Sequence, residues 1–229
     1  MDEQEKISTI ALVHTQGIGA VTVRQLISYC GSASKVFECS YSRLVHIPGV
    51  GDKMAREILR KDKIKWAEQE WAQCQQRNID VHFYSDPNFP ARLKNLYDTP
   101  ILLYSKGNFN YNTSRTVAII GTRQVTEYGK SLTESIVNQL VPYSVVVVSG
   151  LAYGVDITAH RACIQQQVPT IGVMASGLNI IYPAIHQKVA LEMQNLGGIV
   201  TENALDTKPD FMRFPARNRI IAGLSDVII

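Results

Sequence analysis

Five runs of β-branched and other apolar residues alternate with amphipathic segments through the second half of this 229-residue chain. In the first segment between two runs, Leu132, Ile136 and Leu140 recur on one helical face. Near-continuous apolar strands separated by helices predict an α/β fold, in which a parallel sheet is covered on both faces. The expected strands are residues 116–121, 145–150, 170–177, 198–202 and 225–229.

The ends of these predicted strands suit a ligand site. In open α/β sheets, ligands bind beyond the carboxyl ends of the strands, where the strand order reverses. Four of the five runs end in small or polar residues, namely Gly121, Ser149-Gly150, Ser176-Gly177 and Glu202. We therefore expect the site along this edge of the sheet.

The turn after the first run reads IIGTRQVTEYG and differs from the common nucleotide-binding loops. Arg123 stands where the dinucleotide fingerprint has its second glycine, Thr126 stands where it has its third, and the second run lacks a terminal acid. No P-loop lysine follows, so a nucleotide cofactor is not expected. The Thr122 hydroxyl, the Arg123 guanidinium and the amides of the following helix could together hold one phosphate. In the alternative interpretation, Arg123 pairs with a nearby acid such as Glu127.

The segment SGLAYGVDITAHRACIQ forms a second glycine-lined turn before a helix. Asp156 and His160 are one helical turn apart, which is compatible with a catalytic pair. We favour the commoner interpretation, in which Asp156 caps the helix and His160 packs or is hydrogen-bonded. The sequence has no GxSxG elbow, no cysteine with a visible basic activator and no clustered histidines. We therefore expect no catalytic residue and no metal site.

Arginines and aromatic residues interleave in the segment FMRFPARNRIIAGLSD. No acid interrupts its three arginines, which makes the segment suitable for a nucleic-acid backbone with a base stacked beside it. The alternative is an interface helix whose arginines pair with acids of another subunit, with Asn218 bonded to loop backbone. Together with the turn at Arg123, this segment predicts a site for a row of phosphates. The residues concerned are Phe211, Arg213, Phe214, Arg217, Asn218 and Arg219.

The first part of the chain has a helical pattern with two glycine pairs, and we expect an all-α domain over residues 1–76. Each pair precedes an amphipathic helix, as in helix-hairpin-helix elements that bind DNA phosphates through backbone amides. The secondary DNA-binding candidates are Gly17, Gly19, Gly49, Gly51 and Lys53. The pattern is equally compatible with hairpins that only pack the domain or dock a protein partner. Residues 77–114 are rich in proline and tyrosine and are expected to join the sheet, so the second domain covers 77–229.

Composition and the chain ends add three expectations. The net charge of +3 is too small to indicate nucleic acid by itself, so a polyanion site requires a local concentration of charge. The four cysteines lack CxxC spacing, and no signal peptide or membrane-length apolar run is present, which together indicate a cytoplasmic protein. The last run ends at Ile229 without a covering helix, so we expect the natural chain to continue with more strand and helix.

Five motifs in one order make the chain similar to the DprA/Smf family of DNA-processing proteins. They are FPARLKNLYDTPILLYSKGN, VAIIGTRQVTEYG, SGLAYGVDITAH, GLNIIYP and FPARNRIIAGLSD. The resemblance implies an extended Rossmann fold behind a small SAM-like helical domain. It also implies single-stranded DNA binding, protection of incoming DNA, loading of RecA recombinase during natural transformation, and a homodimer. No catalytic reaction is implied.

The resemblance also implies a set of phosphate-binding residues and shows some departures. Tyr153 stands where the family often has arginine, Thr122 replaces the more usual serine, and Ala184 stands where a basic residue is common, with Lys188 nearest to it. Two other functions remain open: a nucleotide-hydrolysing enzyme of the Lonely Guy, lysine-decarboxylase-like group, whose PGGxGTxxE loop is not found here, and a protein-binding scaffold. The implied residues are Gly121, Thr122, Arg123, Gly150, Gly154, Gly177, Arg217, Asn218 and Arg219.

Overall fold

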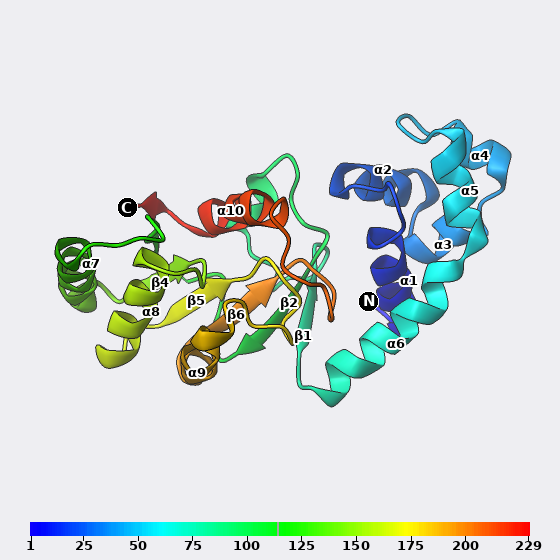
Figure 1. Ribbon diagram of the computed structural model, residues 1–229. Helices are drawn as coiled ribbons and strands as arrows, with labels where there is room; N and C mark the ends of the chain where they lie inside the picture. Colours follow the sequence, from blue (N-terminus) through cyan, green and yellow to red (C-terminus); the bar gives the residue numbers. More distant parts are fainter. Residues whose placement is uncertain (114) are drawn as a thin grey trace. The chain divides into compact units, whose positions relative to one another are not determined.

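The computed structural model describes residues 1–113 and 115–229 (Figure 1). The chain divides into two compact units, and each is described by itself. The first contains Met1–Asn78 with the segments Phe83–Asp86 and Tyr97–Leu102, and the second contains the remaining residues. No helix among the described residues is long and apolar enough to cross a lipid bilayer.

Six helices make up most of the first unit. Three of them begin at short polar side chains that cap the helix: Asp2 accepts from the Glu5 amide, and Ser32 and Ser40 cap two later helices in the same way. The Glu5 carboxylate also accepts from the amides at the start of the third helix, which ties it to the first. The helices are α1 (Glu3–Val13), α2 (Ala20–Cys30), α3 (Ala33–Glu38), α4 (Tyr41–Val45), α5 (Asp52–Arg60) and α6 (Asp62–Gln76).

Both expected hairpins are present in this unit. Gly17 and Gly49 have φ angles of +82° and +81°, a region that glycine enters without a steric penalty. Gly19 and Gly51 then occupy the N-cap positions of α2 and α5. At the mouth of α5, the Asp52 carboxylate pairs with Arg56 at 3.0 Å, so negative charge lies beside the amides that were expected to meet phosphate. DNA binding by either hairpin stays a prediction.

The second unit is built on a seven-stranded sheet with the order β1-β2-β6-β5-β4-β3-β7. The five strands predicted from the second half all form, and those from β6 to β7 run parallel, which confirms the α/β class. The sequence did not predict β1, whereas β2 joins the sheet as expected and runs antiparallel to β6. The strands are β1 (Asp80–Phe83), β2 (Leu102–Gly107), β3 (Thr116–Ala118), β4 (Val146–Ser149), β5 (Thr170–Val173), β6 (Gly198–Thr201) and β7 (Val227–Ile228).

The order in which the chain visits the strands places helices on both faces. From β3 to β6 the chain advances one strand at a time in the same direction, so right-handed crossovers put the three intervening helices on one face. It then returns to the far side of β3, which puts the last helix on the opposite face, as Figure 1 shows. The helices are α7 (Glu127–Leu140), α8 (Val155–Gln165), α9 (Gln187–Glu192) and α10 (Arg213–Leu224), with 3-10 turns η1 (Arg92–Asn95), η2 (Val141–Tyr143), η3 (Ala184–His186) and η4 (Met193–Asn195).

An apolar core lies between β3, β4 and the helices α7 and α8. It is formed by fully or nearly fully buried aliphatic side chains, among them Ile119, Val137 and Val147. Burial on this scale is the main stabilising contribution in a domain of this size. The same packing leaves the loops after β3 and β4 fixed at their bases.

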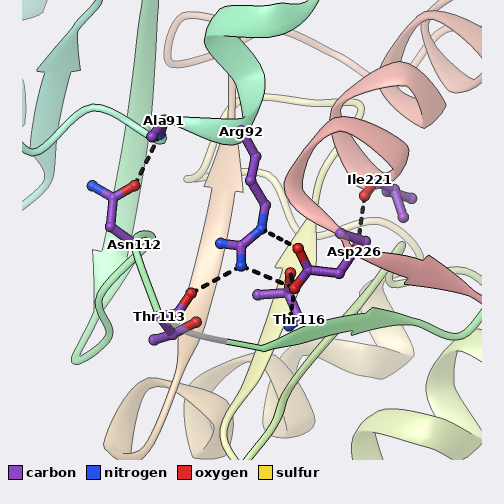
Figure 2. A network of polar contacts seen from close by, with 8 residues as sticks. Ala91, Arg92, Asn112, Thr113, Thr116, Ile221 and Asp226 are labelled. Atoms are coloured by element: carbon purple, nitrogen blue, oxygen red, sulfur yellow. Dashed lines mark hydrogen bonds and ion pairs between the residues drawn. The ribbon is translucent and has the colours of Figure 1, made fainter.

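A polar network fixes η1 to the start of β3 and to the segment after α10 (Figure 2). The Arg92 guanidinium donates to both carboxylate oxygens of Asp226, at 2.7 and 2.9 Å, and to the Thr113 carbonyl at 2.9 Å. Asp226 also accepts from the amide and the hydroxyl of Thr116, at 2.8 and 3.0 Å. Bidentate arginine–carboxylate geometry is the strongest form of this contact, so the network holds the sequence before β3 against the sequence after α10.

Candidate nucleic-acid interface

A crevice opens at the carboxyl edge of the sheet, at the point where the strand order reverses between β3 and β7. It has a volume of about 630 Å³ and lies between the loop after β3, the start of α8 and one face of α10. A smaller hollow of about 110 Å³ shares Arg123, Ala152, Phe214 and Arg217 with it. The larger crevice is lined by Ile120, Gly121, Arg123, Ala152, Asp156, Phe211, Phe214, Pro215, Arg217, Asn218, Ile221, Ala222 and Ile228.

Arg123 is exposed at the mouth of both hollows. The central carbon of its guanidinium lies 4.9 Å from the centroid of the Phe214 ring, a cation–π contact. Glu127, the acid expected in the alternative interpretation, instead pairs with Lys130 at 2.6 Å. Arg123 has no carboxylate partner among the described residues, so the alternative pairing is wrong.

Arg217 is the second arginine of the crevice, and its side chain is held from several sides. Only 7% of its surface is exposed. One guanidinium nitrogen donates to the Val173 carbonyl at the end of β5, and Nε donates to the Asn218 side-chain oxygen at 3.2 Å. Burial lowers the pKa of Arg217, the Asp156 charge opposes that effect, and the Arg123 charge adds to it. Arginine nevertheless remains protonated at neutral pH, so two cations share the crevice.

The side chains of Asp156 and Arg217 both lie close to Gly150, which leaves room for them. A Cβ atom on Gly150 would lie 2.3 Å from an Arg217 nitrogen and 2.4 Å from an Asp156 oxygen, a space that no larger residue could share. The Asp156 carboxylate accepts from the Ala152 amide at 3.4 Å. Burial raises the pKa of Asp156, and the nearby Arg217 charge partly offsets that effect.

The expected capping role of Asp156 is wrong. The N-cap of α8 is Gly154, which makes no side-chain capping bond, and Asp156 lies within the first turn. His160, in contrast, is packed as expected: it is fully buried, and its Nδ1 donates at 2.8 Å to the Thr170 hydroxyl, which itself donates to the Val147 carbonyl. Burial lowers the pKa of His160 to about 3, so the ring is neutral.

The loop containing Gly121, Thr122 and Arg123 rests on the start of α8. Gly154 has a φ of +81°, and a Cβ there would lie 2.0 Å from the Thr122 carbonyl oxygen, so only glycine permits this approach. The Val155 amide donates to that carbonyl at 3.2 Å. This amide is therefore used within the protein, whereas the amides expected to meet a phosphate belong to the helix after the loop. The helix after the loop, α7, begins only at Glu127.

Several residues implied by the resemblance lie away from the crevice lining. The Gly177 amide donates to the Thr207 carbonyl at 2.9 Å, and the Thr122 hydroxyl accepts from the Gln124 amide at 3.1 Å. Lys188 extends into solvent opposite Glu192, at 3.8 Å. These groups are used within the protein or point elsewhere.

Two of the three arginines of the FMRFPARNR segment are also engaged outside the crevice. Arg213, at the start of α10, donates to the Lys208 carbonyl at 3.1 Å. Arg219 forms an ion pair with Glu202, at the end of β6. The geometry therefore concentrates the candidate site on Gly121, Arg123, Arg217 and Asn218, with Gly150 and Gly154 providing the space for them.

Residues 80–229 match the protein family described as DNA recombination-mediator protein A. The chain belongs to this family. It is 31% identical over 233 aligned residues to Protein Smf of Synechocystis, covering all of this chain and 58% of that protein. It is 36% identical over 159 residues to DNA processing protein DprA of Bacillus subtilis, covering 69% of this chain and 54% of that protein. The chain thus spans a little over half the length of these curated relatives.

Two solved structures are similar to this member of the family. DNA processing protein A of Streptococcus pneumoniae superposes with a TM-score of 0.80 at 26% identity, over 99% of this chain and 77% of that one. DNA processing protein A of Helicobacter pylori, described with its single-stranded DNA binding mode, superposes with a TM-score of 0.59 at 36% identity, over 66% and 67%.

Three aromatic residues of this family member surround the smaller hollow. The ring centroids of Tyr182 and Phe214 are 5.8 Å apart, and those of Tyr153 and His186 are 5.2 Å apart. Tyr153, which stands where the family often has arginine, thus adds a ring to the hollow in place of a cation. Local sequence patterns do not mark Tyr153 and Tyr182 as site residues, because the loops after three different strands bring them to one hollow with Phe214.

Proposed function

We propose that this chain binds single-stranded DNA by its phosphates in the crevice between the loop after β3 and α10. The single observation that carries the proposal is the position of Arg123, exposed over the Phe214 ring at the mouth of a crevice whose wall contains Arg217. Two guanidinium groups in one crevice repel each other, and a phosphate between them would remove that repulsion. A guanidinium can also bind a phosphate through two parallel hydrogen bonds.

The aromatic residues at the crevice favour a single strand over a closed nucleotide site. Phe211 is 83% exposed, and Tyr182 is 48% exposed beside Phe214. Unpaired bases stack on such rings without regard to sequence, whereas the bases of a duplex are already stacked. Phosphate contacts likewise read no sequence, so little sequence preference is expected. The family membership and the single-stranded DNA binding mode described for the Helicobacter pylori relative support the same choice.

Affinity measured across a salt series tests this function. The ligands are an oligothymidine, a matched duplex and AMP, and the proteins are the wild type, Arg123→Ala and the control Arg161→Ala. Arg161 is exposed on α8 and lines a different groove, so its loss should leave the affinity nearly unchanged. We expect the single strand to bind best and Arg123→Ala to weaken it. Equal affinity for the duplex would rule out the proposed preference, and tight AMP binding with release of free base would favour the nucleotide-hydrolysing enzyme.

For the complete protein we propose the wider role that its resemblance to the DprA/Smf family implies. It would be a cytoplasmic homodimer that protects incoming DNA and loads RecA during transformation. The proposal rests on the family and on the single-strand site. It is tested by following RecA assembly on a single strand with wild-type protein and with Arg123→Ala. RecA assembly that is unaffected by either protein would count against loading, and a monomeric mass in sedimentation would count against the homodimer.

A further inference from the structure

Two cysteines of the helical unit face each other at short range. The Sγ atoms of Cys30 and Cys39 are 3.3 Å apart, close enough for an S–H···S hydrogen bond. Cys30 is the last residue of α2, and Cys39 is the C-cap of α3. Gly31 lies between these helices in the left-handed region, with φ +98°, and turns the chain so that α3 packs against α2. The fold therefore brings together two thiols that are nine positions apart.

These two thiols differ from the other two cysteines in their access to solvent. Cys30 and Cys39 keep 7% and 8% of their surface exposed, whereas Cys74 and Cys163 are completely buried. All four are free thiols in the structure. The close pair is therefore more accessible to a small oxidant than Cys74 and Cys163, which serve as internal controls.

We propose that Cys30 and Cys39 form a reversible disulfide when the protein meets hydrogen peroxide. One thiolate attacks a peroxide oxygen, the O–O bond breaks, and a sulfenic acid and water form. The partner thiol then attacks the sulfenic sulfur, the S–O bond breaks, water leaves and the S–S bond forms. The two thiols lose two electrons and two protons, and the peroxide accepts both. A dithiol reductant reverses the change by supplying two electrons and two protons.

The disulfide would link α2 covalently to the end of α3. Such a link restricts the unfolded chain, so the helical unit should resist unfolding more strongly when oxidised. Burial and the hydrogen bond to Cys39 raise the pKa of Cys30 to about 11. Arg43 is the charged group that opposes this effect. Because thiolate is the reactive form, little of Cys30 is reactive at neutral pH, and the pair stays reduced until an oxidant is present. The pair therefore responds to an oxidant slowly and becomes faster as the pH rises.

Limited oxidation followed by mass spectrometry tests the proposal on the full chain. The protein is treated with a few equivalents of hydrogen peroxide, denatured, alkylated with N-ethylmaleimide and digested. We expect one crosslinked peptide pair that joins Cys30 to Cys39 and is lighter by two hydrogens, with Cys74 and Cys163 alkylated as free thiols. Dithiothreitol should restore all four thiols. Cys30→Ser and Cys39→Ser should each abolish the crosslink, and Cys74→Ser should retain it.

Other outcomes would overturn the proposal. Alkylation of Cys30 and Cys39 as free thiols, under conditions that oxidise Cys74 or Cys163, would show that proximity does not direct the reaction. A crosslink that joins different chains or includes Cys74 would assign the reactivity elsewhere. Because the wild-type protein itself gives the readout, a serine variant that fails to fold does not affect the result.

Discussion

The guanidinium of Arg123 lies over the ring of Phe214, with its central carbon 4.9 Å from the ring centroid. One residue belongs to the loop after β3 and the other to α10, which lie on opposite sides of the reversal in strand order. The contact holds the Arg123 cation at the mouth of the crevice. A carboxylate partner would neutralise its charge, whereas the aromatic ring does not. An exposed cation that keeps its full charge is available to a phosphate.

The Arg123→Ala variant should therefore lose DNA affinity and keep its stability. Removal of one cation from the phosphate track should lower the slope of log affinity against log salt by about 0.7 for a single strand. The loss should be similar for every sequence, because phosphates carry no sequence information. A salt titration by fluorescence anisotropy, paired with a thermal melt, measures both quantities. A lower melting midpoint with an unchanged slope would show that Arg123 has a structural role only.

The Phe214→Leu variant measures the contribution of the Phe214 ring to DNA affinity separately from that of the arginine charges. Loss of an exposed cation–π contact removes about 0.5–1 kcal/mol, so the affinity for single strands should fall about two- to fivefold. The salt slope should stay at the wild-type value, because both arginines remain. Phe214→Tyr keeps a ring face and is the matched control, with affinity close to that of the wild type. A slope that falls with Phe214→Leu would contradict this division of roles.

The Gly150→Ala variant tests whether binding depends on the position of the Arg217 side chain. The new methyl group would lie 2.3 Å from an Arg217 nitrogen and 2.4 Å from an Asp156 oxygen, so one of these side chains must move. Overpacking of this kind costs about 1–3 kcal/mol of stability. Displacement of Arg217 should weaken single-strand binding on the order of tenfold, the equivalent of about 1.4 kcal/mol.

A matched control for this variant is Gly172→Ala in β5. There the nearest atom to a new Cβ is the flexible end of Met193, at 3.0 Å. This substitution should affect stability and leave DNA affinity at the wild-type value. If both alanine variants weaken binding equally, the effect of Gly150→Ala reflects general damage to the fold.

The sequence predicted the sheet and the edge where the site lies, because both depend on local patterns. Apolar runs and helical periodicity indicated the strands, and small residues at the ends of the runs indicated the ligand edge. It could not predict which arginine faces the crevice, since Arg217 and Arg219 are two residues apart on α10 and differ only in what the fold places beside them. Asp156 shows the same limit: a capping residue and a buried counter-ion have the same local sequence, and only the position of Arg217 distinguishes them.

The Arg219→Gln variant should act on stability and spare binding. The Arg219 guanidinium forms an ion pair with Glu202, and about a quarter of each side chain is exposed, 24% and 26%. Loss of this partner from a partly buried carboxylate should destabilise the fold by about 2 kcal/mol. Single-strand affinity should stay within about twofold of the wild-type value, and the double variant with Glu202→Gln should recover part of the stability. A large loss of affinity in a stable Arg219→Gln protein would return Arg219 to the binding site.

The Asp226→Asn variant tests the network in Figure 2 and has a defined pH dependence. The hydrogen bond from Arg92 is the largest effect that lowers the pKa of Asp226, and bonds from Thr116 act in the same direction. The folded state therefore favours the ionised carboxylate. Its stabilisation is present above the unfolded pKa of about 3.9 and is lost as the pH falls through the lower folded value.

At neutral pH we expect Asp226→Asn to destabilise the protein by about 1 kcal/mol, a modest value because 45% of the Asp226 side chain is exposed. This corresponds to a fall of about 2–4 °C in melting midpoint. The difference from the wild type should be constant between pH 8 and about pH 5 and should shrink toward pH 2. Glu134→Gln, an exposed acid on α7 without an ion pair among the described residues, is the control and should show little difference at any pH. A difference between Asp226→Asn and wild type that persists unchanged at pH 2 would mean that the side chain acts through its shape and not through its charge.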